Sequence, residues 1–227
     1  MDFKWSKMIY NYWTTVFIPL YLRFIYYRLF KSIKTFKFQG EYYKYFYRWY
    51  NTTWKNERAV EIPIVCKLIN EYKNFELLEI GNVLSHYFEL NHDVIDKYEK
   101  AEGVINQDVV DFHPSKKYDL IVSISTLEHV GWDETPKDPN KIFPTLKNLK
   151  TCLVRGGKLI VTIPIGQNPF LDKFLEKGKI KFTENYYLKR ISSENEWFEL
   201  GSNFSKAKYN HPFPSANVLF LGIYQKE

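Results

Sequence analysis

Hydrophobic residues in the second part of the chain form short continuous runs, separated by segments with helical periodicity. Residues 118–125, YDLIVSIS, are apolar at most positions, as is typical of a strand buried on both faces of a parallel sheet. Residues 57–72 instead place Ile64 and Leu68 at helical spacing, with Pro63 expected in the first turn, where a helix tolerates proline. The pattern predicts helices that alternate with buried strands.

The same two patterns recur along the chain. Further strands are predicted at 75–80, 93–96, 103–106, 156–165 and 217–225, and further helices at 85–90 and 140–154. This alternation favours an α/β fold of the Rossmann type, with a mostly parallel sheet and helices on both faces. Ligands of such sheets bind at the carboxyl ends of strands, so the polar residues that follow each strand are the candidate site residues.

Basic and aromatic residues are concentrated in the first quarter of the chain. The net charge of the 227 residues is +6, and residues 1–60 hold eleven Lys and Arg against three Asp and Glu. They also hold 21 of the 42 aromatic residues. This shift divides the chain into a basic, aromatic, helical extension over residues 1–56 and a second domain over residues 57–227.

The extension is compatible with several partners. Residues 8–22 carry no charge, but they are interrupted by Pro19 and fall short of the ~20 apolar residues that span a bilayer. Arg28, Lys31 and Lys34 recur at helical spacing and are expected on one face. Cations beside Trp and Tyr suit peripheral contact with an anionic membrane, and they also suit single-stranded nucleic acid. The third alternative is packing against the second domain.

The remaining composition favours a cytoplasmic protein, with membrane association limited to the periphery. Cys66 and Cys152 both lie in apolar surroundings and are expected to be reduced core residues. No small-residue cleavage site follows the first apolar run, so no secretory signal is expected. The five histidines show no pairing at metal-ligand spacing and there is no CxxC, so we expect no metal.

The segments that follow the strands carry a family resemblance. Five motifs occur in order between residues 75 and 165: LLEIG, VIDKYE, NQDVVDF, YDLIVSISTLEHV and LKNLKTCLVRGGKLIVTIP. This series resembles the successive motifs of class I S-adenosylmethionine-dependent methyltransferases. The resemblance implies a Rossmann-like methyltransferase fold, S-adenosylmethionine as the cofactor, and methyl transfer as the activity.

The first motif departs from the family pattern, which usually reads E-x-G-x-G-x-G. Of its glycines, the segment 79–85 keeps only Gly81. Asn82 adopts a left-handed conformation more readily than most residues, whereas Val83 does not, so the turn must differ in shape. Glu79 is expected either to hold this turn or to bind the methionine amino group.

The resemblance also implies roles for later residues. Asp96 would bind the ribose hydroxyls, or it would cap the segment that follows. Asp108 matches the family acid near the adenine amino group, although it could equally be a turn residue. The expected cofactor-binding residues are Glu79, Gly81, Asn82, Asp96, Asp108 and Ser125.

The acceptor is expected beside the segment that leaves the central strand. His129 is the candidate general base, because imidazole takes up protons near neutral pH. Glu128 or Asp133 would orient it or take its place. The other candidates on this side are Trp132, Asn168, Tyr186, Tyr187 and His211, whereas His86, His92 and His113 are expected at the surface or as caps.

The resemblance does not name the acceptor. A sugar or glycan-precursor hydroxyl is the first candidate, and RNA or a lipid-linked molecule is the second. Because the later glycines are missing, a third reading is a degenerate methyltransferase fold that serves as a membrane-associated binding module.

Overall fold

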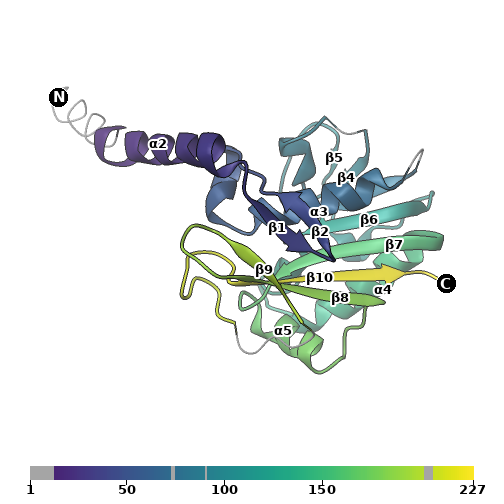
Figure 1. The fold of residues 1–227 in the computed structure, drawn as a ribbon. Helices are drawn as coiled ribbons and strands as arrows, with labels where there is room; N and C mark the ends of the chain where they lie inside the picture. The colour runs from purple at the N-terminus through teal and green to yellow at the C-terminus, as the bar shows by residue number, and fades with distance from the viewer. Residues whose placement is uncertain (1–12, 73–74, 90, 202–206) are drawn as a thin grey trace, which may run out of the picture.

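The computed structural model describes residues 13–72, 75–89, 91–201 and 207–227. Its centre is an eight-stranded sheet with the strand order β5-β4-β3-β6-β7-β10-β8-β9 (Figure 1). The strands are β3 (Leu77–Ile80), β4 (Asp93–Ile95), β5 (Val104–Ile105), β6 (Tyr118–Ile124), β7 (Leu153–Pro164), β8 (Glu184–Arg190), β9 (Trp197–Leu200) and β10 (Val218–Gln225).

The first five strands of the sheet are parallel. β3 pairs with β4 on one side and with β6 on the other, and β5 and β7 extend the two halves outward. The strand order therefore reverses between β3 and β6, as in the Rossmann topology. β10 lies antiparallel between β7 and β8. This arrangement is the mostly parallel α/β fold that the sequence predicts.

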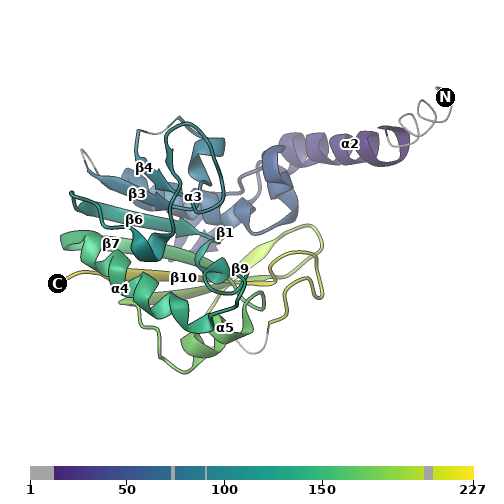
Figure 2. The same cartoon turned by 180° about the vertical axis from the view of Figure 1, so that it is seen from behind.

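The two faces of the sheet carry separate hydrophobic clusters. Val122 points into one cluster and its neighbour Ile121 into the other, as the two-residue period of a strand requires. Helix α3 (Arg58–Asn70) covers the first face, whereas α4 (Ile142–Cys152) and α5 (Pro169–Glu176) cover the second (Figures 1 and 2). Helices on both faces explain why the central strands are apolar at nearly every position.

The predicted helix over residues 85–90 is wrong. The segment 85–90 was expected to be helical, but the chain forms only a 3-10 turn over Leu84–His86, and residue 90 lies outside the described residues. The backbone N–H groups of Val83 and Leu84 donate to the buried carboxylate of Glu79, which holds the chain in a tight turn. The strands β8 and β9 were not predicted.

Pro63 lies inside α3 rather than in its first turn. Proline has no N–H, so it leaves the carbonyl of Ala59 without its usual helical partner. The N–H of Phe46 donates to this carbonyl at 2.9 Å. A segment of the extension therefore satisfies the backbone group that the proline leaves open, and the helix continues through it.

Within the described residues, the extension is helical near its start and again in a 3-10 helix over Tyr50–Lys55. One helix runs over residues 13–31, with α2 (Ile18–Tyr26) flanked by a π turn at each end. A hairpin of β1 (Thr35–Phe38) and β2 (Glu41–Lys44) follows. Its loop residues Gln39 and Gly40 both have positive φ, which matches the right-handed twist of the two strands. The expectation for residues 1–12 lies outside the described residues.

Residues 35–56 pack into the domain, whereas the helix before them projects from it (Figures 1 and 2). Phe36, Tyr47 and Trp54 belong to the same buried cluster as α3. The hydroxyl of Tyr45 accepts a hydrogen bond from the N–H of Trp197 at 2.9 Å. No helix within the described residues is long and apolar enough to cross a membrane.

Candidate cofactor and methyl-transfer site

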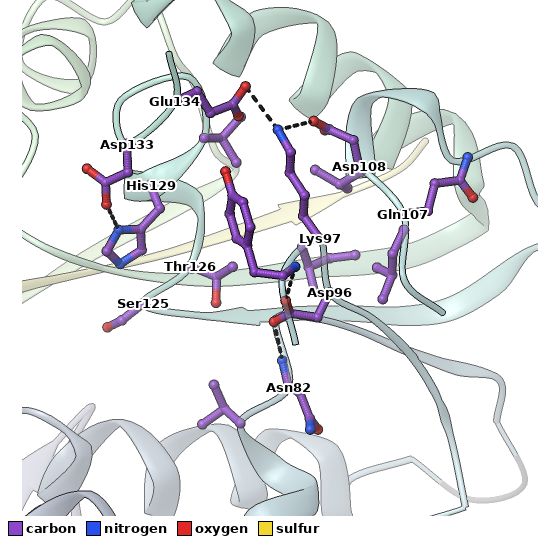
Figure 3. Close-up of a pocket in the computed structure, with 17 residues that line it drawn as sticks. Asn82, Asp96, Lys97, Gln107, Asp108, Ser125, Thr126, His129, Asp133 and Glu134 are labelled. Carbon is purple, nitrogen blue, oxygen red and sulfur yellow. Dashed lines mark hydrogen bonds and ion pairs between the residues drawn. The ribbon is translucent and has the colours of Figure 1, made fainter. Parts of the chain in front are cut away.

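A cavity of about 470 Å³ lies at the carboxyl ends of β3, β4 and β6, where the strand order reverses (Figure 3). Its size is within the range of small-molecule sites, ~300–1,000 Å³. Seven of the eight cofactor and catalytic residues predicted from the sequence line it: Gly81, Asn82, Asp96, Asp108, Ser125, His129 and Asp133. Residues from four separate segments of the chain therefore meet in one pocket.

The first turn needs a single glycine. Gly81 has φ of +82°, whereas no other residue of 79–85 has a positive φ. A Cβ atom on Gly81 would lie 2.2 Å from the hydroxyl oxygen of Thr126, so a side chain does not fit there. Asn82 and Val83 follow in ordinary conformations. The turn can thus close without the later glycines of the family pattern.

Glu79 is the one predicted residue that does not line the cavity. Its carboxylate is fully buried beneath the turn, where it accepts the N–H groups of Val83 at 2.9 Å and Leu84 at 2.7 Å. It also lies 2.7 Å from Nε2 of His92, whose side chain is 2% exposed. The surface position expected for His92 is wrong, because a buried carboxylate requires a partner. Glu79 therefore holds the turn, the first of its two expected roles.

Asp96 ties the first turn to the end of β4. Its Oδ2 accepts the N–H of Asn82 at 3.2 Å (Figure 3). Its Oδ1 accepts the N–H groups of Tyr98 and Glu99, both at 2.8 Å. These bonds match the capping alternative. A carboxylate has about four lone-pair sites, so acceptor capacity is left for a ligand hydroxyl in the cavity. The ribose-binding role stays a prediction.

Asp108 belongs to an ion-pair network on the far side of the cavity. Its Oδ2 lies 2.8 Å from Nζ of Lys97 and 2.6 Å from Nζ of Lys141. Both lysines also pair with Glu134, Lys97 at 3.0 Å and Lys141 at 2.6 Å, and Figure 3 shows the pair with Lys97. Burial pushes the pKa of Asp108 upward, but hydrogen bonds from Lys141 and Lys97 bring it below the ordinary value. Sequence reasoning missed both lysines and Glu134.

His129 is oriented by Asp133. Its Nδ1 lies 2.5 Å from Oδ2 of Asp133, one helical turn further along the chain (Figure 3). A carboxylate accepts but does not donate, so we assign the proton of the neutral ring to Nδ1. Nε2 then keeps its lone pair, and it lies 3.4 Å from the amide nitrogen of Gln167. This arrangement fits the general-base role predicted for His129.

A buried acidic group lies behind the cavity. Glu128 is 1% exposed, and neither of its carboxyl oxygens has a hydrogen-bond partner. Burial raises its pKa well above the ordinary value, the charge of Glu61 raises it further, and Arg58 opposes both. Arg58 pairs with Glu61 at 2.7 Å, and the carboxylate of Glu61 accepts from the Ser125 hydroxyl. Glu128 lies beside His129, 3.6 Å from its Nε2.

The other acceptor-side candidates do not line the cavity. Asn168 caps α5 and donates to the carbonyl of Glu128 at 2.8 Å. Tyr186 and Tyr187 pack against aromatic rings on either face of the sheet. Trp132 contacts Lys137. His211 lines a separate cavity near β8.

No family model matches the chain, and no curated protein does. Among solved structures it is similar to the N-methyltransferase NodS from Bradyrhizobium japonicum WM9, in complex with S-adenosyl-L-homocysteine. The identity is 12% and the TM-score 0.46, over 72% of this chain and 84% of that chain.

Two further structures are similar at the same level. For a SAM-dependent methyltransferase from Archaeoglobus fulgidus the identity is 15% and the TM-score 0.46, over 72% of this chain and 91% of that one. For an rRNA methylase from Streptococcus thermophilus the identity is 9% and the TM-score 0.44, over 74% of this chain and 97% of that one. The strand order, the antiparallel β10 and the cavity at the reversal define this chain as a Rossmann-like α/β protein.

Proposed function

We propose that this protein is an S-adenosylmethionine-dependent methyltransferase. The observation that carries the proposal is the cavity at the reversal of strand order, which gathers the residues that the family motifs mark. Gly81 comes from the first motif, Asp96 from the second, Asp108 from the third, and Ser125 and His129 from the fourth. Motifs that merely preserved the fold would not need their polar residues to face one cavity.

The lining of the cavity fits the cofactor. Asp96 would hold the ribose, because an acid at the end of the second strand accepts hydroxyl donors in related nucleotide sites. The apolar side chains of Ile95 and Val109 line the same cavity and would contact the adenine ring. Asp108 would face the adenine amino group while keeping its lysine partners. When bound, S-adenosylmethionine supplies an electrophilic methyl group.

His129 and Asp133 would act on the acceptor. A hydroxyl or amine must give up a proton as it attacks, and Nε2 of His129 is available to take it while Asp133 holds the ring through Nδ1. In-line alignment of the two reactants at ~3–3.5 Å can supply ~7–11 kcal/mol of the barrier reduction. The site therefore needs no group beyond a base and a well-shaped cavity.

The acceptor that we propose first is the hydroxyl of a sugar or glycan precursor, with RNA and lipid-linked molecules next in the screen. The supporting observation is only that the base serves any acceptor which loses a proton. Methyl transfer to each class is measured with radiolabelled cofactor.

Calorimetry with S-adenosylhomocysteine tests the cofactor site. If Asp96 accepts the ribose hydroxyls, removal of the 2′-hydroxyl from the ligand should weaken binding to the parent protein by ~1.5–3 kcal/mol, the scale for hydrogen bonds to a charged group. The same removal should cost less in Asp96→Asn, because the neutral amide makes a weaker hydrogen bond to the hydroxyl than the carboxylate does. This comparison separates the ribose contact from the role of Asp96 in the turn, because any effect on the turn is common to both ligands.

The matched control is Asp111→Asn, which removes a neighbouring carboxylate that does not line the cavity. It should leave the penalty for the missing hydroxyl unchanged. If the loss of the 2′-hydroxyl weakens binding equally in the parent protein and in Asp96→Asn, Asp96 does not bind the ribose. If the parent protein binds neither S-adenosylmethionine nor S-adenosylhomocysteine, the binding-module alternative replaces this proposal.

A further inference from the structure

The helix over residues 13–31 touches the body of the protein along one face only. Figures 1 and 2 show it extending away from the sheet and its covering helices. Phe24 and Tyr27 are its buried residues, and they belong to the cluster that includes α3. The ring of Trp49 contacts Phe24 at 5.5 Å and Tyr21 at 5.8 Å between ring centroids. The base of the helix is therefore firmly joined to the domain.

The rest of its surface is apolar and exposed. Ile18, Leu22 and Leu29 recur at spacings of four and seven residues, which places them on one stripe of the helix, and Ile33 follows four residues further, just past the end of the helix. Ile33 is 81% exposed, and Leu22, Leu29 and Phe30 are exposed by 60% or more. The full set of exposed large apolar residues in this segment is Val16, Ile18, Tyr21, Leu22, Tyr26, Leu29, Phe30 and Ile33. Scattered surface residues are ordinary, but a contiguous stripe marks an interaction surface.

The charges of this segment are all positive. Residues 13–40 contain no Asp or Glu. Arg28, Lys31 and Lys34 were expected on one face, and the two lysines of this set turn toward the body of the protein. Lys31 lies 3.5 Å from Glu194 and Lys34 pairs with Glu196, both on the body of the protein. The lysines thus join the helix to the body of the protein, and the apolar stripe faces outward.

We propose that this helix lies in the interface of an anionic membrane. Its stripe would enter the boundary between headgroups and acyl chains, where apolar helix faces are buried and Tyr rings are favoured. The exposed cation Arg28 would meet anionic headgroups, whereas Arg23 lies 3.7 Å from Glu194. The methyltransferase domain would be held at the membrane surface, with its acceptor approaching from the same side of the membrane.

Charge distinguishes this partner from a second copy of the chain. A two-fold dimer through the stripe would bring the same surface from each subunit together. Because residues 13–40 carry cations and no acids, the helix of a second copy would offer Arg28 no complementary group. An anionic lipid surface supplies that complement along the whole helix.

Co-sedimentation of the full chain with vesicles tests the proposal. Vesicles of phosphatidylcholine with phosphatidylserine should bind more protein than phosphatidylcholine alone, and the binding should weaken as salt screens the charges. Leu22→Glu with Leu29→Glu should lower the partition coefficient at least about tenfold, since each change sets a charge in the apolar boundary. Both residues are exposed, so the domain should keep its thermal unfolding transition.

The matched control is Ile191→Glu with Phe198→Glu, which adds the same charge at exposed apolar residues outside the helix. It should bind vesicles within about twofold of the parent protein. The single variant Ile33→Glu keeps the test open if the double variant does not fold. Equal binding of the helix variants and the parent protein would overturn the proposal. So would a dimer in lipid-free solution that the helix variants dissociate, since the stripe would then cover a second copy.

Discussion

Gly81→Ala is the substitution whose cost the structure describes most directly. Gly81 has φ of +82°, and a Cβ there would lie 2.2 Å from Oγ1 and 2.7 Å from Cγ2 of Thr126. Thr126 is held in place because its hydroxyl donates to the carbonyl of Ile124 at 3.1 Å. The added methyl group therefore meets both an unfavourable backbone conformation and a side chain that cannot turn away without losing a hydrogen bond.

The two costs can be separated. A left-handed conformation costs a residue with a Cβ ~1–2 kcal/mol. Overpacking of a tight site adds ~1–3 kcal/mol. Gly81→Ala should thus lower the free energy of unfolding by about 2–5 kcal/mol. It should also weaken S-adenosylhomocysteine binding, because a shift of the turn displaces the N–H of Asn82 from Asp96.

Gly103→Ala is the matched control. Gly103 has nearly the same φ, +78°, but a Cβ there would meet nothing within 4 Å. It should cost only the conformational ~1–2 kcal/mol and leave ligand binding unchanged. Urea unfolding followed by circular dichroism gives both free energies, and calorimetry gives the affinities.

A double-mutant cycle with Thr126→Ala isolates the contact. That change removes Oγ1 and Cγ2 and leaves a Cβ at 3.0 Å, so the cost of Gly81→Ala should fall by ~1–3 kcal/mol in this background. Equal costs for Gly81→Ala and Gly103→Ala, with no coupling to Thr126, would refute the close packing of the turn against the segment after β6.

Two further predictions concern ionisable groups. Burial raises the pKa of Asp172 to about 6, above its unfolded value of ~3.9, so the native state holds the proton longer. The stability that this proton supplies is full below pH ~4 and is lost as the pH rises to about 6. The free energy of unfolding of Asp172→Asn should therefore rise relative to that of the parent protein, by up to ~3 kcal/mol, between pH 4 and pH 7. Urea unfolding measures this difference. His129→Ala should lower the methylation rate by ~10²–10⁴, while the affinity for S-adenosylhomocysteine stays nearly unchanged. Full activity in the folded variant would show that His129 is not the base, and that either alignment suffices or Asp133 takes the proton.

The predictions from sequence succeeded where the signal is local. A strand covered on both faces is apolar at nearly every residue, so β6 could be predicted without knowing which strands lie beside it. Because ligands bind at the carboxyl ends of parallel strands, the residues after β3, β4 and β6 could be named as site candidates in advance. That Gly81, Asp96 and His129 then line one cavity follows from the strand order and not from their spacing in the chain.

The partners of those residues could not be predicted. Nothing near Asp108 in the sequence indicates that Lys141 will pair with it, or that His92 will meet Glu79. The helical spacing of Lys31 and Lys34 was visible, but which side they would face depended on where Glu194 and Glu196 lie.

The amino-acid sequence alone therefore determined the order of the five parallel strands with α3 and α4, the basic and aromatic character of the extension, and the set of candidate polar residues. The tertiary structure decided which of these share a cavity, which are used up in holding a turn, and which face of the first helix is left uncovered. The physical reason is the distance along the chain over which each feature is determined. Periodicity is set by the covalent geometry of neighbouring residues, whereas an ion pair or a buried contact depends on where residues distant in the chain come to lie.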